Sequence, residues 1–173
     1  MTIAEITAYI LSNFKNVNVI EANGDLFFMY DQQKMMPFAT IVTSDNDFDR
    51  VSQLNREGFF RLNIGVDKTS FISTFEGIAL KKGIGAYVDS GIDFTAENIV
   101  MPHPFYGAMY WLCIVKPDKK SLPVLKNHLD VAYRLAVKRL KWQSVISLLN
   151  WFLFRKFRHD KLNITSLFEY KNQ

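Results

Sequence analysis

The chain has 173 residues, of which 49% are apolar and 22% are charged, a composition that suits a globular domain with one well-buried core. Cys113 is the single cysteine, which excludes an intramolecular disulfide, and the first residues lack the basic and apolar regions of a signal peptide. We therefore expect a cytoplasmic protein. The longest apolar-rich run, residues 145–154, is about half as long as a bilayer requires, so we expect no membrane span.

The net charge of +4 is unevenly distributed along the chain. Residues 1–117 carry a balance of −4, whereas residues 118–173 carry +8. A basic C-terminal third would suit nucleic acid or another polyanion as a partner. It would equally suit the acidic remainder of the same molecule, and both interpretations stay open.

The first predicted elements are a helix and three short strands. Thr2 and Glu5 have the spacing of a capping box, and apolar residues three and four apart predict a helix from Ile3 to Phe14. Alternation then predicts strands at 17–22, 26–30 and 38–43, with a hairpin turn at 23–25 and a polar turn at 31–34. Strands joined by such short links must be antiparallel, so the pattern favours an α+β fold.

The densest acidic cluster follows the third strand. Asp45, Asp47 and Asp49 have the spacing of the first three ligands of a calcium loop, but Arg50 and Arg56 stand where that loop requires Gly and Glu. We therefore predict no metal here. We expect a solvated loop in which Arg50 or Arg56 compensates the charge of Asp49.

The strongest strand signal covers residues 59–66. Its even-numbered residues are all apolar and should face the core, whereas Arg61 and Asn63 lie on the opposite face. Hydroxyls within residues 68–70 are predicted to cap a short helix that ends near residue 76. Arg61 and Asn63 then either hold an anion or polar ligand beside that helix start, or belong to a half-exposed strand in which Arg61 pairs with a carboxylate.

Residues 77–98 are predicted to be mostly loop. The Gly-rich segment 81–85 lacks the spacing of a phosphate loop, and no zinc-like Cys/His spacing occurs, so we predict neither a cofactor nor a metal. Pro102 and Pro104 hold His103 in a rigid backbone next to Tyr106. His103 there would act as an acid, a base or a metal ligand, or it would hydrogen-bond a backbone carbonyl and fix the loop to the sheet edge.

The last two elements are a buried strand and a long helix. Residues 109–115 are almost wholly apolar, which predicts a central strand with Cys113 as an inert core residue. Ser121 is predicted to cap a helix with Pro123 in its first turn and an apolar stripe from Leu122 to Leu140. Residues 142–173 are predicted to form a basic, aromatic helical extension, which would bind an anionic membrane or nucleic acid, pack on the domain, or form a homodimer.

Three motifs resemble a known family. These are Ser52-x-Leu54-x-Arg56-x-Gly58-x-Phe60 through Val66, then Met101-Pro102-His103-Pro104-x-Tyr106-Gly107, then Trp111-x-Cys113-Ile114-Val115-x-Pro117. Together they resemble an uncharacterised bacterial family, domain-of-unknown-function family number 6194, over residues 2–141. The resemblance implies a small α/β domain with helices from both chain ends, similar to the YjbR-like fold. It implies no activity and assigns no catalytic residue.

The sequence as a whole predicts an α+β domain at residues 1–141, with the extension at 142–173. We expect an antiparallel sheet of five to six strands, with the N-terminal and C-terminal helices packed on one face. The function expected first is a binding or interaction module. The alternative is a small-molecule enzyme or sensor whose polar site contains Arg61, Asn63, His103 and Tyr106, which requires these four residues to converge at one pocket.

Overall fold

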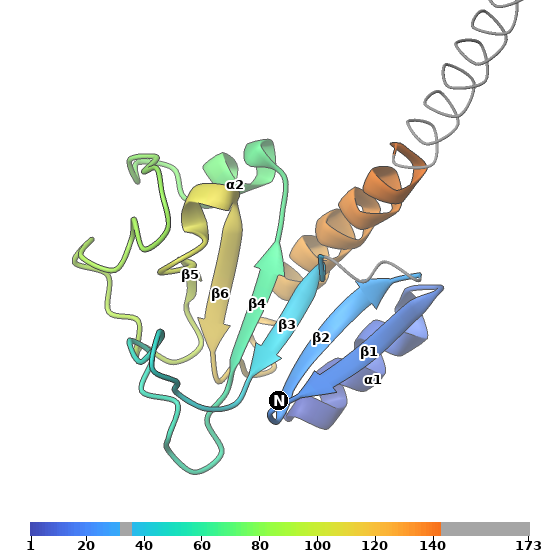
Figure 1. Ribbon diagram of the computed structural model, residues 1–173, viewed down its shortest axis with the longest axis horizontal. Coiled ribbons are helices and arrows are strands. Elements are labelled where there is room, and N and C mark those ends of the chain that lie inside the picture. The colour runs from blue at the N-terminus through green and yellow to red at the C-terminus, as the bar shows by residue number, and fades with distance from the viewer. Residues whose placement is uncertain (32–35, 143–173) are drawn as a thin grey trace, which may run out of the picture. The chain divides into compact units, whose positions relative to one another are not determined.

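The computed structural model describes residues 1–31 and 36–142, and it has the predicted α+β architecture (Figure 1). Six antiparallel strands form one sheet in the order β1-β2-β3-β4-β6-β5. The strands are β1 (Val17–Ala22), β2 (Asp25–Tyr30), β3 (Ala39–Val42), β4 (Arg61–Gly65), β5 (Val100–Pro102) and β6 (Trp111–Val115). The prediction of five to six antiparallel strands is confirmed.

The N-terminal helix α1 (Ile3–Asn13) begins at the predicted capping box. The Glu5 amide donates to the Thr2 hydroxyl at 3.1 Å, and the Thr2 amide donates to the Glu5 carboxylate at 2.8 Å. The β1–β2 hairpin turns at Asn23 and Gly24, whose φ angles of 55° and 83° are those of a tight type I′ turn. The polar turn predicted at 31–34 lies outside the described residues beyond Asp31.

Helix α2 (Lys68–Thr74) starts differently from the prediction. Its N-cap is Asp67, whose carboxylate accepts the Ser70 amide at 2.8 Å, so the hydroxyls of residues 68–70 are not the cap. A carboxylate accepts this amide more strongly than a hydroxyl because the bond is charge-assisted. The start of this helix is therefore already occupied by a negative group.

The segment before β6 also corrects a prediction. Residues Gly107–Met109 form the 3₁₀ turn η1, and Tyr110 has the left-handed φ of 63°, so the strand predicted from residue 109 begins only at Trp111. Apolar composition alone does not reveal a turn of this kind, since left-handed backbone is uncommon outside glycine. The segment between α2 and β5 is irregular as predicted, apart from one bridge between Glu97 and Val115.

The C-terminal helix, residues 122–142, carries Pro123 in its first turn as predicted. Ser121 precedes it, but the Ser121 hydroxyl donates to the Asp118 carbonyl at 3.0 Å and so stabilises the preceding turn. Trp142 is the one residue of the predicted extension that the structure describes. Within the described residues, no helix is both long and apolar enough to cross a bilayer.

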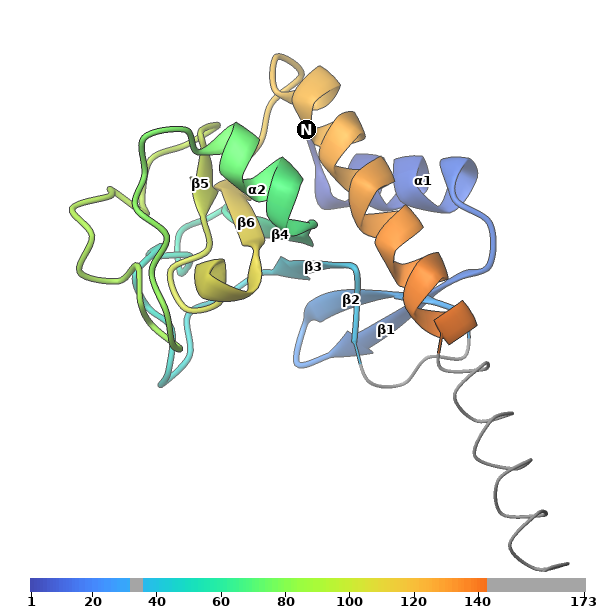
Figure 2. The same ribbon diagram turned by 90° about the horizontal axis from the view of Figure 1, so that it is seen from above.

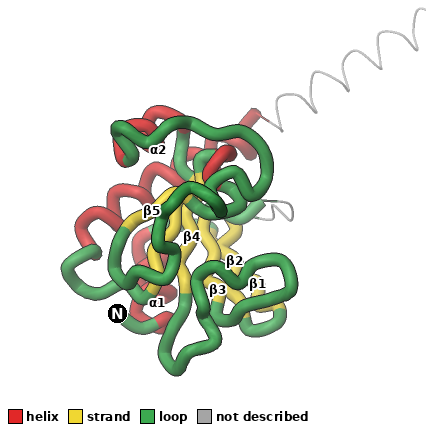
Figure 3. Tube along the Cα trace, turned by 90° about the vertical axis from the view of Figure 1, so that its left-hand side faces the viewer, coloured by secondary structure: helices red, strands yellow, loops and turns green. Residues whose placement is uncertain are grey.

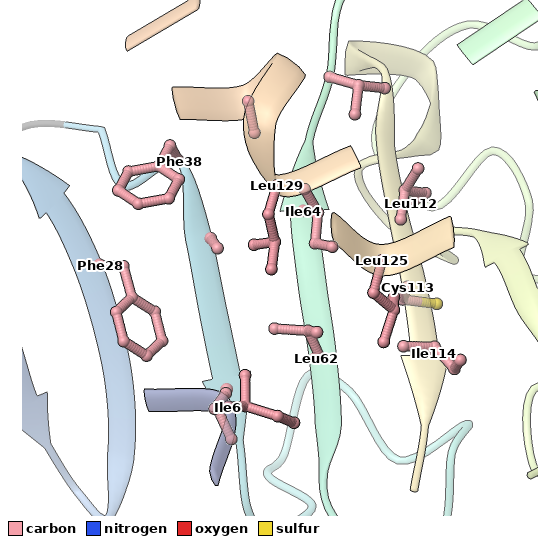
Figure 4. Close-up of a cluster of buried hydrophobic side chains, with 14 of the residues drawn as sticks. Ile6, Phe28, Phe38, Leu62, Ile64, Leu112, Cys113, Ile114, Leu125 and Leu129 are labelled. Atoms are coloured by element: carbon pink, nitrogen blue, oxygen red, sulfur yellow. The ribbon is translucent and has the colours of Figure 1, made fainter. Parts of the chain in front are cut away.

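The core lies between the sheet and two helices. Residues Met1–Val137 form one compact unit, in which α1 and residues 122–137 of the C-terminal helix lie over the same face of the sheet (Figure 2). This confirms the predicted layer arrangement. Buried apolar side chains of both layers meet in the cluster of Figure 4: Ile6, Phe28, Phe38, Leu62, Ile64, Leu112, Ile114, Leu125 and Leu129. Burying each such side chain contributes about 1.5–3 kcal/mol.

The strand register decides which side chains share the other face. Thr40 of β3 lies directly opposite Asn63 of β4, which lies opposite Cys113 of β6. Directly opposite residues of antiparallel strands point to the same side, so these three side chains face away from the helices. The long loops that follow β3 and α2 lie beside the sheet (Figure 3). The loop after β3 supplies partners for Arg61 on this face.

Candidate functional site

The guanidinium of Arg61 forms the centre of the site. Its Nε donates to Asn63 Oδ1 at 2.9 Å, and its Nη1 donates to the Ser52 hydroxyl at 2.8 Å and to Asp49 Oδ1 at 3.4 Å. Its Nη2 donates to Asp49 Oδ2 at 2.5 Å and lies 3.5 Å from His103 Nε2. Nε, Nη1 and Nη2 therefore all donate to protein acceptors, and the second N–H of Nη2 lies on the side of His103.

The burial of this group corrects the predicted half-exposed strand. The Arg61 side chain is only 2% exposed and that of Asp49 only 13%. The carboxylate partner considered for Arg61 is present, but it is Asp49, which therefore does not pair with Arg50 or Arg56 as predicted. Arg50 pairs with Asp47 on the surface, and the Arg56 guanidinium stacks 3.6 Å above the Phe59 ring. The loop after β3 folds Asp49 over the sheet, which a spacing argument cannot foresee.

Asn63 is held in one orientation by its two neighbours. Its side-chain oxygen accepts from Arg61 Nε, and its side-chain nitrogen donates to the Thr40 hydroxyl at 2.9 Å. Both bonds are buried. The network from Asp49 through Arg61 and Asn63 to Thr40 therefore fixes the polar floor of the site and joins β3 to β4.

His103 follows edge strand β5 and is 3% exposed. Its Nδ1 accepts the backbone amides of Phe105 and Tyr106, each at 3.2 Å. The ring thus holds the loop after β5 in place, as one of the two predictions for His103 required. The bond differs from that prediction, because the ring accepts from backbone amides and does not donate to a backbone carbonyl. Burial and, secondarily, the charge of Arg61 hold the pKa of His103 well below its usual 6.5, so the ring is neutral at physiological pH.

These residues meet at a pocket of about 360 Å³. The polar floor comprises Arg61, Asn63, Thr40, Asp49 and His103. The walls are largely apolar and aromatic: Phe27, Met36, Pro37, Val42, Phe48, Met109 and Trp111, with Tyr106 and Asn46 at the rim. The structure therefore brings together the four residues Arg61, Asn63, His103 and Tyr106, which the sequence placed in one site.

One wall depends on a glycine. Trp111 lies opposite Gly65 in the β4–β6 ladder, and its indole covers the glycine so closely that an added Cβ would lie 2.9 Å from Trp111 Cε2. Gly65 has an ordinary φ, so its value here is the absence of a side chain. The flat face of the indole thereby becomes part of the pocket wall.

The reactive side chains in and beside the pocket are held in their neutral forms. His103 is a weak base because its pKa is depressed and its Nδ1 is occupied. Cys113 is fully buried, and burial raises the pKa of its thiol to about 12, so it is a poor nucleophile, in line with its predicted core role. Within residues 1–31 and 36–142, no group of three metal-ligating side chains is gathered.

The sequence predicted four of the fourteen residues that line the pocket and missed the others. Asp49 was assigned to a solvated loop, and Thr40 and Trp111 were read only as strand residues. The signal for Thr40 and Trp111 was the antiparallel order of the strands. Once the register is known, Thr40 lies opposite Asn63 and Trp111 lies opposite Gly65. Asp49 had no such signal because its position depends on a long loop.

The fold and the site together define a small α+β domain with a ligand-sized pocket on the sheet face opposite its helices. The chain belongs to the family of unknown function DUF6194, which matches residues 1–144. The predicted family membership is thus confirmed. Comparison with curated proteins and with solved structures gives no match.

Proposed function

We propose that this domain binds a small molecule with a flat, largely apolar body in the pocket between Trp111, Phe48 and the floor residues. The observation that carries the proposal is the convergence of a buried hydrogen-bonded floor and aromatic walls on one cavity of about 360 Å³. Pockets for small ligands and cofactors have volumes of about 300–1,000 Å³ and combine apolar walls with a few fixed polar groups.

The buried ion pair supports a role in the site. Placing Arg61 and Asp49 in the protein interior costs desolvation that their attraction barely offsets, and apolar replacements are often as stable. The pair is therefore poorly explained as a device for stability alone. Together with Asn63 and Ser52, it holds polar groups rigidly at the floor, which is what recognition of an oriented ligand needs.

Screening by ligand-observed NMR with a library of small aromatic compounds tests this proposal on the full chain. Met109→Trp should fill the pocket, because Met109 lines it and is half exposed. Ile99→Trp adds the same indole at an equally exposed position that does not line the pocket. We expect compounds that bind the unmodified protein and the Ile99→Trp variant but not Met109→Trp. No binding compound, or equal binding to both variants, would overturn the proposal.

The extension at 142–173 suggests a second partner, but only through its sequence. Its predicted roles in binding nucleic acid or another polyanion and in homodimerisation lie outside the described residues beyond Trp142, and they stay predictions. The domain boundary at residue 141, the YjbR-like similarity, a bacterial source and a cytoplasmic location also stay predictions. A salt titration of DNA binding by the full chain tests the polyanion prediction, since phosphate contacts weaken steeply with salt.

A further inference from the structure

The His103 ring has hydrogen-bond donors on both sides. Two backbone amides point at Nδ1 at 3.2 Å, and Arg61 Nη2 lies 3.5 Å from Nε2. A neutral imidazole has one accepting nitrogen and one N–H, so it cannot accept on both sides. The two shorter contacts to Nδ1 outweigh the single longer one, which places the ring proton on Nε2.

The Nε2–H group then lacks an acceptor. Its one neighbour within hydrogen-bonding distance in residues 1–31 and 36–142 is the donor Arg61 Nη2. A buried N–H without a partner is costly, and His103 is 3% exposed. Because His103 lines the pocket, a group bound in the cavity is placed to complete this bond.

The neighbouring floor groups are also donors. The Thr40 hydroxyl accepts from Asn63 Nδ2, which leaves its own proton available to the pocket. Arg61 Nη2 directs one N–H toward Asp49 and the other toward the space beside His103. An entering oxygen would therefore meet donors from two or three directions.

The charge of the floor limits what that oxygen belongs to. The positive charge of Arg61 is balanced by Asp49 at 2.5 Å, and His103 is neutral. An entering carboxylate would be desolvated without a net positive charge to compensate it, and it would also approach Asp49, which lines the pocket. An uncharged carbonyl satisfies the same donors without that cost.

We propose that the ligand is an uncharged aromatic molecule whose carbonyl oxygen accepts from His103 Nε2–H and Arg61 Nη2–H. The aromatic body lies against Trp111, and an adjacent N–H of an amide or lactam has Asp49 within the pocket as its acceptor. This inference rests on the proposed function, since it specifies the ligand class of the same pocket.

The test compares 2-naphthamide with 2-naphthoate, which share one ring system and differ in charge. Titrations of the full chain should show that the amide binds at least about tenfold more tightly, the value of about one additional net hydrogen bond. His103→Asn keeps an oxygen near the position of Nδ1 for the two amides but has no group at the position of Nε2. Both ligands lose the Nε2–H donor in this variant, so the affinity for 2-naphthamide should fall about fivefold or more.

The outcomes separate the two proposals. Equal or tighter binding of 2-naphthoate overturns the inference while pocket binding stands, and an unchanged affinity of His103→Asn for 2-naphthamide also overturns it. Long-range ¹H–¹⁵N spectra of the His103 ring give a second readout without any ligand. A proton on Nε2 is expected, and a proton on Nδ1 overturns the inference whether or not a compound binds. If no compound of the wider aromatic library binds, the proposed function itself fails.

Discussion

The buried Asp49–Arg61 pair gives the sharpest quantitative prediction. Asp49→Asn keeps the shape of the side chain but removes the charge that balances Arg61, whose side chain is 2% exposed. Removing one partner of a buried pair costs about 3–5 kcal/mol, because the remaining charge stays desolvated and uncompensated. That is a large part of the total of about 5–15 kcal/mol that stabilises a typical domain.

Urea unfolding followed by far-UV circular dichroism measures this loss, and Asp47→Asn is the matched control. It makes the same chemical change two residues away and breaks the pair between Asp47 and Arg50, whose side chains are 101% and 68% exposed. Such exposed pairs are screened by water and salt, so the control should unfold close to the unmodified protein. The two variants have equal net charge, so their difference reports burial.

A double variant distinguishes the lost pair from general disturbance of the loop. Arg61→Met combined with Asp49→Asn removes the uncompensated charge, and we expect it to cost less than the sum of the two single variants. The Asn63 and Ser52 side chains still lose a partner in it, so recovery is partial. The reasoning is refuted if Asp49→Asn is no less stable than Asp47→Asn, or if the two single effects simply add.

Three further predictions concern the same face of the sheet. Gly65→Ala should displace the indole of Trp111, lower the free energy of unfolding by about 1–3 kcal/mol and weaken ligand binding, as tryptophan fluorescence and binding titrations will show. Cys113, with a thiol pKa of about 12, should resist a thiol-specific reagent at pH 8 in the folded protein and react once urea unfolds it. The free energy of unfolding should fall as the pH drops below 6.5, because the pKa values of buried His103 and His128 are lowered in the folded protein and the unfolded chain therefore binds protons first. Each histidine contributes up to about 1.4 kcal/mol per pH unit. The variant His103→Asn should therefore show a shallower dependence of the unfolding free energy on pH.

Each of these has a contrary result. Unchanged fluorescence and stability in Gly65→Ala would mean that the indole does not cover β4. Rapid labelling of Cys113 in the folded protein would contradict its burial. A pH slope that is the same with and without the His103 side chain would show that its ring titrates alike in both states, which would remove the argument that it is held neutral.

The sequence alone determined the fold class and most of its elements. Periodicity and capping are local properties, so the helix after Thr2 and the hairpin at Asn23-Gly24 follow from residues near one another in the chain. Alternation in β4 likewise assigned Leu62 to the core and Arg61 to the opposite face. Short links between the first three strands then required those strands to be antiparallel.

Local patterns also failed at the starts of two elements. The start of α2 was assigned to hydroxyls, but the Asp67 carboxylate precedes them and accepts the amide. The strand before Trp111 was extended through residues 109 and 110, where the backbone turns instead. The first error came from the choice of capping side chain, and the second came from backbone geometry that side-chain periodicity does not encode.

Only the tertiary structure decided what the polar residues do. Arg61 and His103 are 42 residues apart, and their contact depends on β6 lying between β4 and β5 and on the loops that cover this face. Asp49 reached Arg61 through a loop with no periodic pattern. The sequence therefore determined which face each strand residue occupies, since that follows from the two-residue period. Which polar groups meet there, and whether they stay charged, was decided by long-range packing and burial.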